Sequence, residues 1–205
     1  MVGRQMESHD LALTMTGPAP EESTADSAQA LERAMGGDRA AFDELLRCYE
    51  RRVLMTAWRI LGSKEDAQDA AQEVFLRLYR QLQRVDPKRP LMPWLYRMTV
   101  NVCHDLHRKR RWNPDLRVEE ANCPSTEGDP TGEITRAEQK QMIAAALQTL
   151  TEKERSAVVL RDIEGLSTSE VAGILGSRET TVRSQISSAR VKIKKFVERL
   201  ERGRS

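Results

Sequence analysis

The sequence predicts an all-α protein of two small helical domains joined by a flexible linker. Of its 205 residues, 31% are charged and only 4% are aromatic, a balance that favours helical bundles with aliphatic cores over sheets. Apolar residues recur at spacings of three and four in two blocks, 28–111 and 135–200. Residues 112–134 lack this period and residues 1–27 are polar, so we expect an acidic linker and a disordered acidic leader.

Capping residues set the ends of two consecutive helices in the first block. Asp38 is a good N-cap for a long helix, and Gly62 ends it. Ser63 is suited to cap the next helix, whose apolar stripe runs to Leu82. Acidic residues in the first turn of this second helix complement the positive end of the helix dipole.

A further helix completes the first domain. The Pro-flanked turn at 86–90 interrupts the apolar pattern, and the helix begins near Pro93, because proline is accommodated in a first turn. The helix ends in the basic run 108–111. We therefore expect a bundle of three to four helices over residues 28–111.

The second block contains the pattern of a helix-turn-helix. Residues 151–154 match a capping box, and Ser167 with Glu170 matches another immediately before a short apolar helix. Gly176 ends that short helix, and a longer basic helix starts around Arg178. A short helix, a glycine turn and a longer basic helix together are typical of this DNA-binding unit.

The net charge of +2 conceals an alternation of charge along the chain. Basic residues dominate 97–111 and 178–202, whereas acidic residues dominate 1–32 and 112–138. Clustered positive charge indicates binding to phosphate backbones. For either basic stretch alone, a solvated helix face is an equally good interpretation.

The second helix of a helix-turn-helix enters the major groove of duplex DNA with its N-terminus first. Arginine reads guanine with two hydrogen bonds, glutamate accepts from cytosine, and hydroxyl groups contact phosphates or bases. The predicted duplex-contacting residues are Arg178, Glu179, Thr180, Thr181, Arg183, Ser184, Ser187 and Arg190. The alternative is a surface helix that carries charges without binding DNA.

The helix that ends at residue 111 combines aromatic, amide and cationic side chains. This mixture suits opened DNA, because aromatic faces stack on unpaired bases and cations hold the backbone. The residues predicted to contact opened DNA are Trp94, Tyr96, Arg97, Asn101, His104, Arg108, Lys109, Arg110 and Arg111. Core packing of Trp94 and a surface or capping role for Asn101 remain open alternatives.

The preceding helix carries an acidic face formed by Asp66, Asp69, Gln72 and Glu73. Such a face can pair with a basic protein partner, which fixes the register of the contact and raises the rate of association. From the sequence alone, a solvated face is the favoured interpretation of these residues.

Other classes of function find little support. Motifs for nucleotide binding, zinc proteases and serine hydrolases are absent from the sequence, so we expect neither catalysis nor a cofactor. The three cysteines form no CxxC, which favours reduced thiols in a cytoplasmic protein. Cys103, His104 and His107 lie close together but lack a convincing fourth ligand for zinc. No apolar run is long enough for a membrane span, and the N-terminus does not resemble a signal peptide.

Three motifs, in order along the chain, resemble the sigma-70 family of transcription initiation factors. Residues 66–79 resemble its polymerase-binding helix, and residues 94–101 with the basic run 108–111 resemble its promoter-opening helix, both in region 2. The segments that resemble region 4 are 150–155, 160–167, 170–176 and 181–184. Regions 2 and 4 joined by a short linker are similar to the extracytoplasmic-function (ECF) group.

The resemblance implies a division of labour. Asp69, Gln72 and Glu73 would meet the clamp coiled coil of the largest subunit of core RNA polymerase. Region 4 would bind the flap of the second-largest subunit and read the −35 element of promoter DNA. Asn101 would hold a base flipped from the −10 element, in a pocket closed by the turn at 85–90. An anti-sigma factor is a further candidate partner, and the acidic linker would thread toward the RNA exit path.

The chain also departs from the family pattern. Many ECF factors carry arginine at the positions of Gln185 and Ser188, so we expect different or fewer −35 contacts here. Val85 stands where some members use an aromatic residue against the flipped base, and the acidic leader is not part of the pattern. The alternative function is a conventional regulator, in which 135–198 bind duplex DNA and 28–111 serve dimerisation or sensing.

Overall fold

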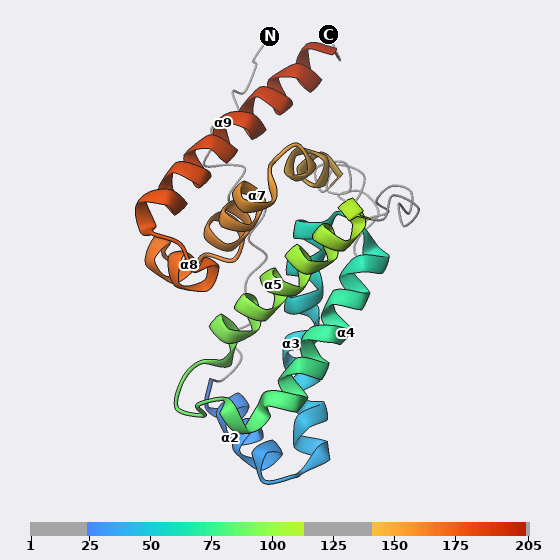
Figure 1. Ribbon diagram of the computed structural model, residues 1–205, viewed down its shortest axis with the longest axis vertical. Coiled ribbons are helices and arrows are strands. Elements are labelled where there is room, and N and C mark those ends of the chain that lie inside the picture. The colour runs from blue at the N-terminus through green and yellow to red at the C-terminus, as the bar shows by residue number, and fades with distance from the viewer. Residues whose placement is uncertain (1–23, 113–140, 204–205) are drawn as a thin grey trace, which may run out of the picture.

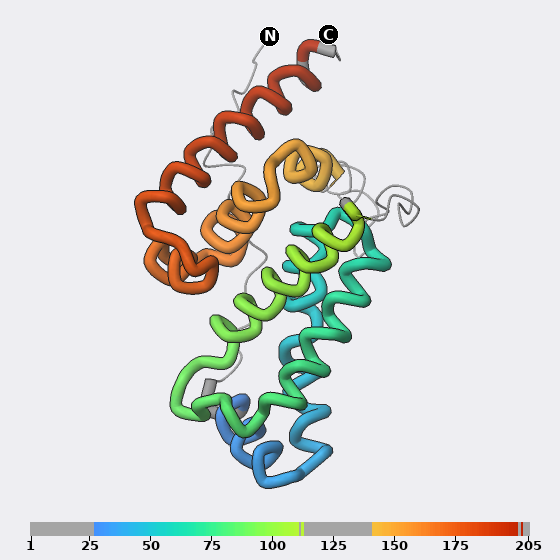
Figure 2. Tube along the Cα trace, in the orientation of Figure 1, coloured from blue at the N-terminus to red at the C-terminus, as the bar shows by residue number. Residues whose placement is uncertain are grey.

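The computed structural model describes residues 24–112 and 141–203, and every regular element in this described part is helical. Figures 1 and 2 show two helical domains, with the long C-terminal helix extending away from the body of the molecule. The predicted all-α architecture of two domains is therefore confirmed. The leader up to residue 23 and residues 113–140, which include most of the predicted linker, lie outside the described residues.

The N-terminal domain packs four α-helices around an aliphatic core. Its elements are α2 (Thr24–Met35), α3 (Arg39–Leu61), α4 (Lys64–Gln81), the short 3-10 helix η1 (Leu82–Arg84) and α5 (Leu91–Trp112). Helix α2 is not among the helices that the sequence predicts, and it begins before residue 28. Leu31 of α2 is 1% exposed, so the apolar stripe formed by Ala30, Leu31 and Ala34 is buried against the other helices and stabilises α2.

The predicted caps of this domain are confirmed. The side chain of Asp38 accepts hydrogen bonds from the amides of Ala40 and Ala41 at 2.9 and 3.2 Å. Gly62 adopts a left-handed φ of 78°, and its amide donates to the carbonyl of Trp58 at 2.7 Å. Ser63 caps α4, while α5 begins at Leu91, slightly before the predicted start near Pro93.

The C-terminal domain follows with a helical segment at 141–148. Its remaining elements are α7 (Glu152–Val158), the π-helix η3 (Val159–Ile163), α8 (Thr168–Leu175) and α9 (Glu179–Gly203). Both predicted capping boxes are present, at the starts of α7 and α8. Gly176 ends α8 with φ 59°, which confirms the predicted turn before α9. The π-helix is not predicted by the sequence pattern.

The two domains lie in direct contact. Helix α5 packs against α8, and α3 meets α7 and η3. Buried apolar side chains form one continuous cluster that includes Leu95 of α5, Leu160 of η3 and Val171 of α8. The C-terminal domain therefore covers one face of α5 and the end of α3.

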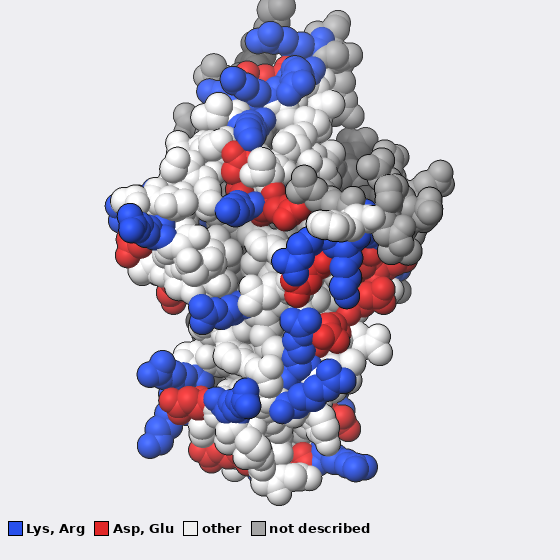
Figure 3. Space-filling view, viewed as in Figure 1, with Lys and Arg blue, Asp and Glu red and all other residues white. Residues whose placement is uncertain are grey.

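Charged side chains lie over the outside of both domains. Figure 3 shows Lys and Arg side chains along α9 and over the lower part of the N-terminal domain, with acidic groups between them. The mixture of signs on this face agrees with the small net charge of +2. Any contact with a phosphate backbone would therefore depend on local clusters of positive charge instead of a uniformly basic surface.

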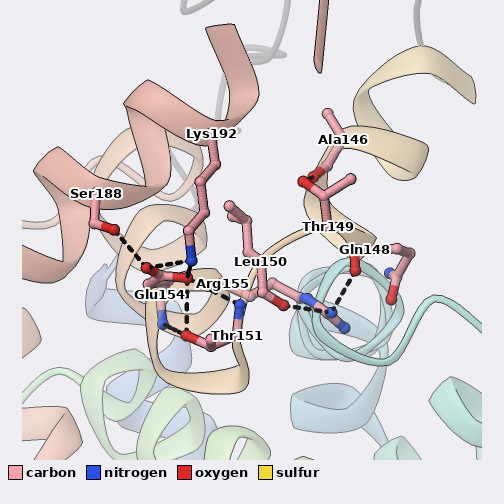
Figure 4. A network of polar contacts seen from close by, with 9 residues as sticks. All are labelled: Ala146, Gln148, Thr149, Leu150, Thr151, Glu154, Arg155, Ser188 and Lys192. Carbon is pink, nitrogen blue, oxygen red and sulfur yellow. Dashed lines mark hydrogen bonds and ion pairs between the residues drawn. The ribbon is translucent and has the colours of Figure 1, made fainter. Parts of the chain in front are cut away.

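Glu154 joins α7 to α9 through a network of polar contacts (Figure 4). Its carboxylate accepts from the ammonium group of Lys192 at 2.7 and 2.8 Å and from the hydroxyl of Ser188 at 2.6 Å. Thr151 completes the capping box by donating its amide and hydroxyl to the same side chain. Burial alone would raise the pKa of Glu154, but hydrogen bonds from Lys192, Ser188 and Thr151 outweigh burial and lower it to about 2.

We predict that Glu154→Gln destabilises the C-terminal domain by about 1–3 kcal/mol at neutral pH, because it removes charge-assisted hydrogen bonds. The pKa of Glu154 falls from its ordinary value of 4.5 to about 2 on folding. Its contribution to stability is therefore fully present above about pH 4.5 and is lost as the pH falls toward 2. Thermal unfolding followed by circular dichroism between pH 2 and 6 measures this difference.

The matched control is Glu198→Gln, because Glu198 lies near the end of α9 and, among the described residues, forms an ion pair only with Lys194, at 4.0 Å. This control should keep the pH dependence of the wild-type protein. Parallel loss of stability in the wild type and in Glu154→Gln over this pH range would contradict the role given to Glu154.

Candidate functional site

The first turns of α9 present the predicted duplex-contacting residues to solvent. Val182, Ile186 and Ala189 are buried and fix the inner face of the helix. The predicted residues lie on the other side and are exposed: Arg178, Glu179, Thr180, Thr181, Arg183, Ser184, Ser187 and Arg190. The structure thus brings the whole predicted set to one surface.

Two ion pairs orient arginines on this surface. Glu179 accepts from Arg183 one helical turn away at 2.9 Å. Asp162 of η3 accepts from Arg190 through two hydrogen bonds, at 2.6 and 2.9 Å. The hydrogen bond to Asp162 is the main reason that the pKa of Arg190 is raised. The paired guanidinium groups are held in defined positions, where they can face phosphates or base edges.

Gln185 and Ser188, at which the chain departs from the family pattern, do not share this outward orientation. Ser188 donates to Glu154 of α7, and Gln185 is half-buried. The side chain of Ser188 therefore belongs to the contact between α9 and α7.

The outer face of α5 carries the second group of predicted DNA-contacting residues. Arg97, Asn101, Arg108 and Lys109 are exposed there. Arg108 also pairs with Asp105 at 2.8 Å, one turn earlier. The exposed groups combine cations with an amide that has no hydrogen bond to fix it among the described residues, which suits contact with a single strand. The side chain of Arg111 lies outside the described part.

Other predicted residues of α5 face inward. Tyr96 is 3% exposed and donates its hydroxyl to Glu164 of the C-terminal domain at 2.7 Å. Burial, and then the nearby Glu164 carboxylate, raise the pKa of Tyr96 far above its ordinary value, so the hydroxyl remains a donor. His104 is half-buried against Ser156 at 2.9 Å, and burial lowers the pKa of His104. Trp94 is half-buried against the core.

Asp66 and Arg110 form an ion pair inside the N-terminal domain. The carboxylate of Asp66 accepts from the guanidinium of Arg110, and Asp66 is 7% exposed. Burial raises the pKa of Asp66, while the charge of Arg110 opposes this change. The pair joins the start of α4 to the end of α5, so the structure places Asp66 away from the acidic surface to which the sequence assigns it, and ties Arg110 to it.

The remaining acidic residues of α4 lie on an outer stripe. Asp69 and Gln72 are exposed, and Glu73 pairs with Arg77 at 2.7 Å. The stripe continues into two apolar residues that the sequence analysis did not select, Leu76 at 43% and Tyr79 at 56% exposure. The sequence could have indicated both residues, because helical spacing places them on the face of Asp69 and Gln72 and away from the apolar core stripe. Exposed apolar groups beside charges are typical of a protein-binding surface.

Cys103, His104 and His107 do not converge on one point. Cys103 is buried, which raises the pKa of its thiol, and His107 faces the carbonyl of Ile60. Cys123 lies outside the described residues. Within residues 24–112 and 141–203, no group of three or more His, Cys, Asp and Glu side chains is arranged to hold a metal ion. In the same part of the chain, no helix is long and apolar enough to cross a membrane.

Comparison with known families matches both domains. Residues 45–113 match the family described as sigma-70 region 2, and residues 140–193 match sigma-70, region 4. The region 2 match contains the outer faces of α4 and α5. The region 4 match contains the helix-turn-helix with its exposed arginines.

Individual relatives cover nearly the whole chain. The RNA polymerase sigma-H factor of Pseudomonas aeruginosa is 34% identical over 85% of this chain and 95% of its own length. The ECF RNA polymerase sigma factor SigM of Mycobacterium tuberculosis is 31% identical over 86% of this chain and 87% of its own length.

A solved structure, CnrH in complex with the cytosolic domain of CnrY, is similar with a TM-score of 0.63 and 25% identity. The likeness covers 84% of this chain and 97% of that chain. The family matches place region 2 before region 4 along the chain, and the relatives and the fold agree with sigma factors over most of its length. The chain therefore belongs to the sigma-70 family, in its ECF group, and is a sigma factor that directs promoter-specific transcription initiation.

Proposed function

We propose that this sigma factor brings core RNA polymerase to its promoters through three separate surfaces, each on one helix. The observation that carries this proposal is the exposure of three different chemistries on α4, α5 and α9. An acidic and apolar stripe suits a protein, an amide among cations suits a single strand, and arginines on a recognition helix suit duplex DNA. We propose residues 28–111, together with the start of α2 at Thr24, and residues 135–200 as the two functional domains.

The start of α9 is proposed to read the −35 element. Entry of its N-terminus into the major groove brings Arg178 and Arg183 to base edges, where arginine prefers guanine. Glu179 orients Arg183 and can accept from cytosine. Arg190, held by Asp162, contributes positive charge toward the phosphate backbone, which fixes the position of the helix without reading the sequence.

The outer face of α5 is proposed to hold the opened −10 element. Asn101 binds a base edge, while Arg97, Arg108 and Lys109 hold the phosphates of the separated strand. The contact of Asn101 with the base exists only when that base is unpaired, so its binding energy favours the melted promoter over the closed duplex. Tyr96 would join this surface only after the C-terminal domain moves away from it.

The outer stripe of α4 is proposed to dock on the clamp coiled coil of core polymerase. Asp69, Gln72 and Glu73 supply polar contacts, and Leu76 with Tyr79 supplies the apolar centre that protein interfaces require. Asp66 is left out of this set because its carboxylate is buried with Arg110 inside the domain.

Further partners follow from the family. Region 4 would bind the polymerase flap, and the acidic linker would thread toward the RNA exit path. The similar structure of CnrH, solved with the cytosolic domain of CnrY, suggests that a partner protein can also hold this chain. We assign the chain no catalytic step of its own, because catalysis belongs to the polymerase, and its place of action is the cytoplasm.

Purified chain should bind core polymerase and give promoter-dependent transcripts, and variants of the two region 2 surfaces should separate these steps. Asn101→Ala removes a contact made only with the opened strand, so it should lower open-complex formation about tenfold with little change in affinity for core. Asp69→Ala is the reciprocal control and should weaken core binding first. Permanganate footprinting measures strand opening, and fluorescence anisotropy measures core binding.

Equal loss of core binding and strand opening in Asn101→Ala would overturn the role of Asn101. A chain that binds duplex promoter tightly by itself, yet never associates with core polymerase, would overturn the whole proposal and indicate a conventional regulator.

Arg183→Ala should weaken initiation from promoters that depend on the −35 element by about tenfold or more, because a bidentate arginine contact contributes about 1–3 kcal/mol of discrimination. Arg199→Ala is the control, since Arg199 is an exposed arginine near the far end of α9. It should affect matched and altered −35 sequences equally. Run-off transcription from both promoters gives the ratio, and an unchanged ratio in Arg183→Ala would remove Arg183 from −35 recognition.

A further inference from the structure

Asp162 of η3 holds Arg190 of α9 through one side of its guanidinium group. The carboxylate accepts from Nε of Arg190 at 2.9 Å and from Nη2 at 2.6 Å. The side chain of Asp162 is 20% exposed, whereas that of Arg190 is 61% exposed. The carboxylate therefore lies toward the body of the domain, and the guanidinium group lies between it and the solvent.

An arginine that is held in this way keeps donors for a second partner. A guanidinium group carries five N–H donors in a rigid planar fork. The contact with Asp162 engages Nε and one N–H of Nη2, which leaves both N–H groups of Nη1 and the other N–H of Nη2. These remaining donors form the outer edge of the group, and such an edge matches two oxygens of one phosphate.

The position of Arg190 on α9 also suits a phosphate. Arg183, Ser187 and Arg190 are exposed and follow one another at spacings of four and three residues, so they share one face of the helix. A rise of about 1.5 Å per residue separates Arg183 from Arg190 by about 10 Å along the helix. The major groove is about 12 Å wide and about 8.5 Å deep. A helix that brings Arg183 to the base edges therefore brings Arg190 near the rim of the groove, where the phosphates lie.

Lys192, two residues further along α9, is held in the opposite way. Its ammonium group donates to both carboxylate oxygens of Glu154, at 2.7 and 2.8 Å, which uses two of its three N–H donors (Figure 4). Glu154 is 8% exposed, so the charge of Lys192 is directed toward α7. The two acids thus divide the neighbouring cations of α9, because Asp162 presents Arg190 and Glu154 retains Lys192.

We propose that Asp162 is a positioning residue for the −35 duplex, which holds Arg190 so that the outer edge of its guanidinium group binds one phosphate of the DNA backbone. This inference rests on the proposed function, because its ligand is the duplex that α9 reads. It adds a direction to the charge of Arg190. It also means that an acidic side chain next to the DNA surface strengthens the binding of a polyanion.

Asp162→Asn separates positioning from charge, because the two predict opposite signs. Removal of the carboxylate makes the domain more positive, so charge alone predicts tighter binding to DNA. Loss of the ionic contact lets the guanidinium group rotate, so positioning predicts that binding weakens about threefold to tenfold. Fluorescence anisotropy measures the affinity of the full chain, assembled with core polymerase, for a labelled promoter fragment at several salt concentrations. Equal or tighter binding by Asp162→Asn overturns the proposal.

Two controls isolate the effect of charge. Glu198→Gln also removes one negative charge, but Glu198 lies near the end of α9 and pairs with Lys194, at 4.0 Å, so this change should not weaken binding. Lys192→Gln removes a positive charge close to Arg190 and should change the affinity by less than about twofold, whereas Arg190→Gln should weaken binding about tenfold. Equal losses in Lys192→Gln and Arg190→Gln would contradict the division of the cations.

A double variant distinguishes positioning from a structural role of Asp162. In a chain that carries Arg190→Gln there is no guanidinium group to position, so adding Asp162→Asn should cause no further loss of affinity. A structural role predicts the same loss in both backgrounds, and that result would overturn the proposal. If Asp162→Asn loses helicity by circular dichroism, Arg190→Lys takes its place. Lysine keeps the charge but lacks the planar fork, so binding should weaken, and an unchanged affinity would contradict the proposal.

The wild-type chain separates this inference from the proposed function. Wild-type initiation that does not depend on the −35 element contradicts the proposed role of α9 itself. Wild-type initiation that depends on the −35 element, together with undiminished binding by Asp162→Asn, contradicts the positioning role alone.

Discussion

The buried guanidinium of Arg155 is the interaction on which the arrangement of the two domains depends. It donates to three carbonyl oxygens, those of Ile60 at 2.6 Å, Leu150 at 3.0 Å and Gln148 at 3.3 Å. These carbonyls lie at or just beyond the C-terminal ends of helices, where acceptors lack internal partners and carry partial negative charge. Burial lowers the pKa of Arg155, yet the group stays charged because arginine titrates far above neutral pH. One cation thus satisfies helix ends from both domains.

The contact between the domains differs in character from the cores within them. Within each domain, aliphatic side chains such as Leu45 and Val171 are fully buried. Across the contact, much of the specificity comes from hydrogen bonds to Glu164 and from Arg155. Polar groups of this kind exchange protein partners for water when they separate, so their net contribution is modest while their geometry is strict. Such an interface is defined in structure without being permanent.

Much of the fold follows from local sequence chemistry. The caps at Asp38, Ser63 and Ser167 and the glycine ends at Gly62 and Gly176 all occur as predicted, because each depends on a few neighbouring residues. The outer surface of α9 is also predictable from the helical period, since its buried positions recur every three to four residues and the exposed positions lie between them.

The remaining features depend on residues far apart in the sequence. Helix α2 is a short helix that is stabilised by packing on α3. Asp66 and Tyr96 look like surface residues by type, yet each is buried by a partner distant in the chain, Arg110 and Glu164 respectively. A single sequence specifies no such pairing, so an acidic residue that binds a partner protein and one that binds its own domain appear alike. For the same reason, the sequence does not predict that Arg59 of α3 donates a hydrogen bond to Glu164, at 2.7 Å.

The π-helix η3 accommodates one residue more before Glu164 than a regular α-helix would hold. The amide of Glu164 bonds to the carbonyl of Val159, five residues back, so this turn contains one residue more than an α-helical turn. The wider turn absorbs the extra residue, so Glu164 takes nearly the direction that the preceding position would have in an unbroken α-helix. The same residues in α-helical geometry would turn Glu164 by about a further 100°, away from α3 and α5. A deletion of one codon within Val159–Ile163 would therefore restore α-helical geometry and leave Glu164 facing its partners on α3 and α5.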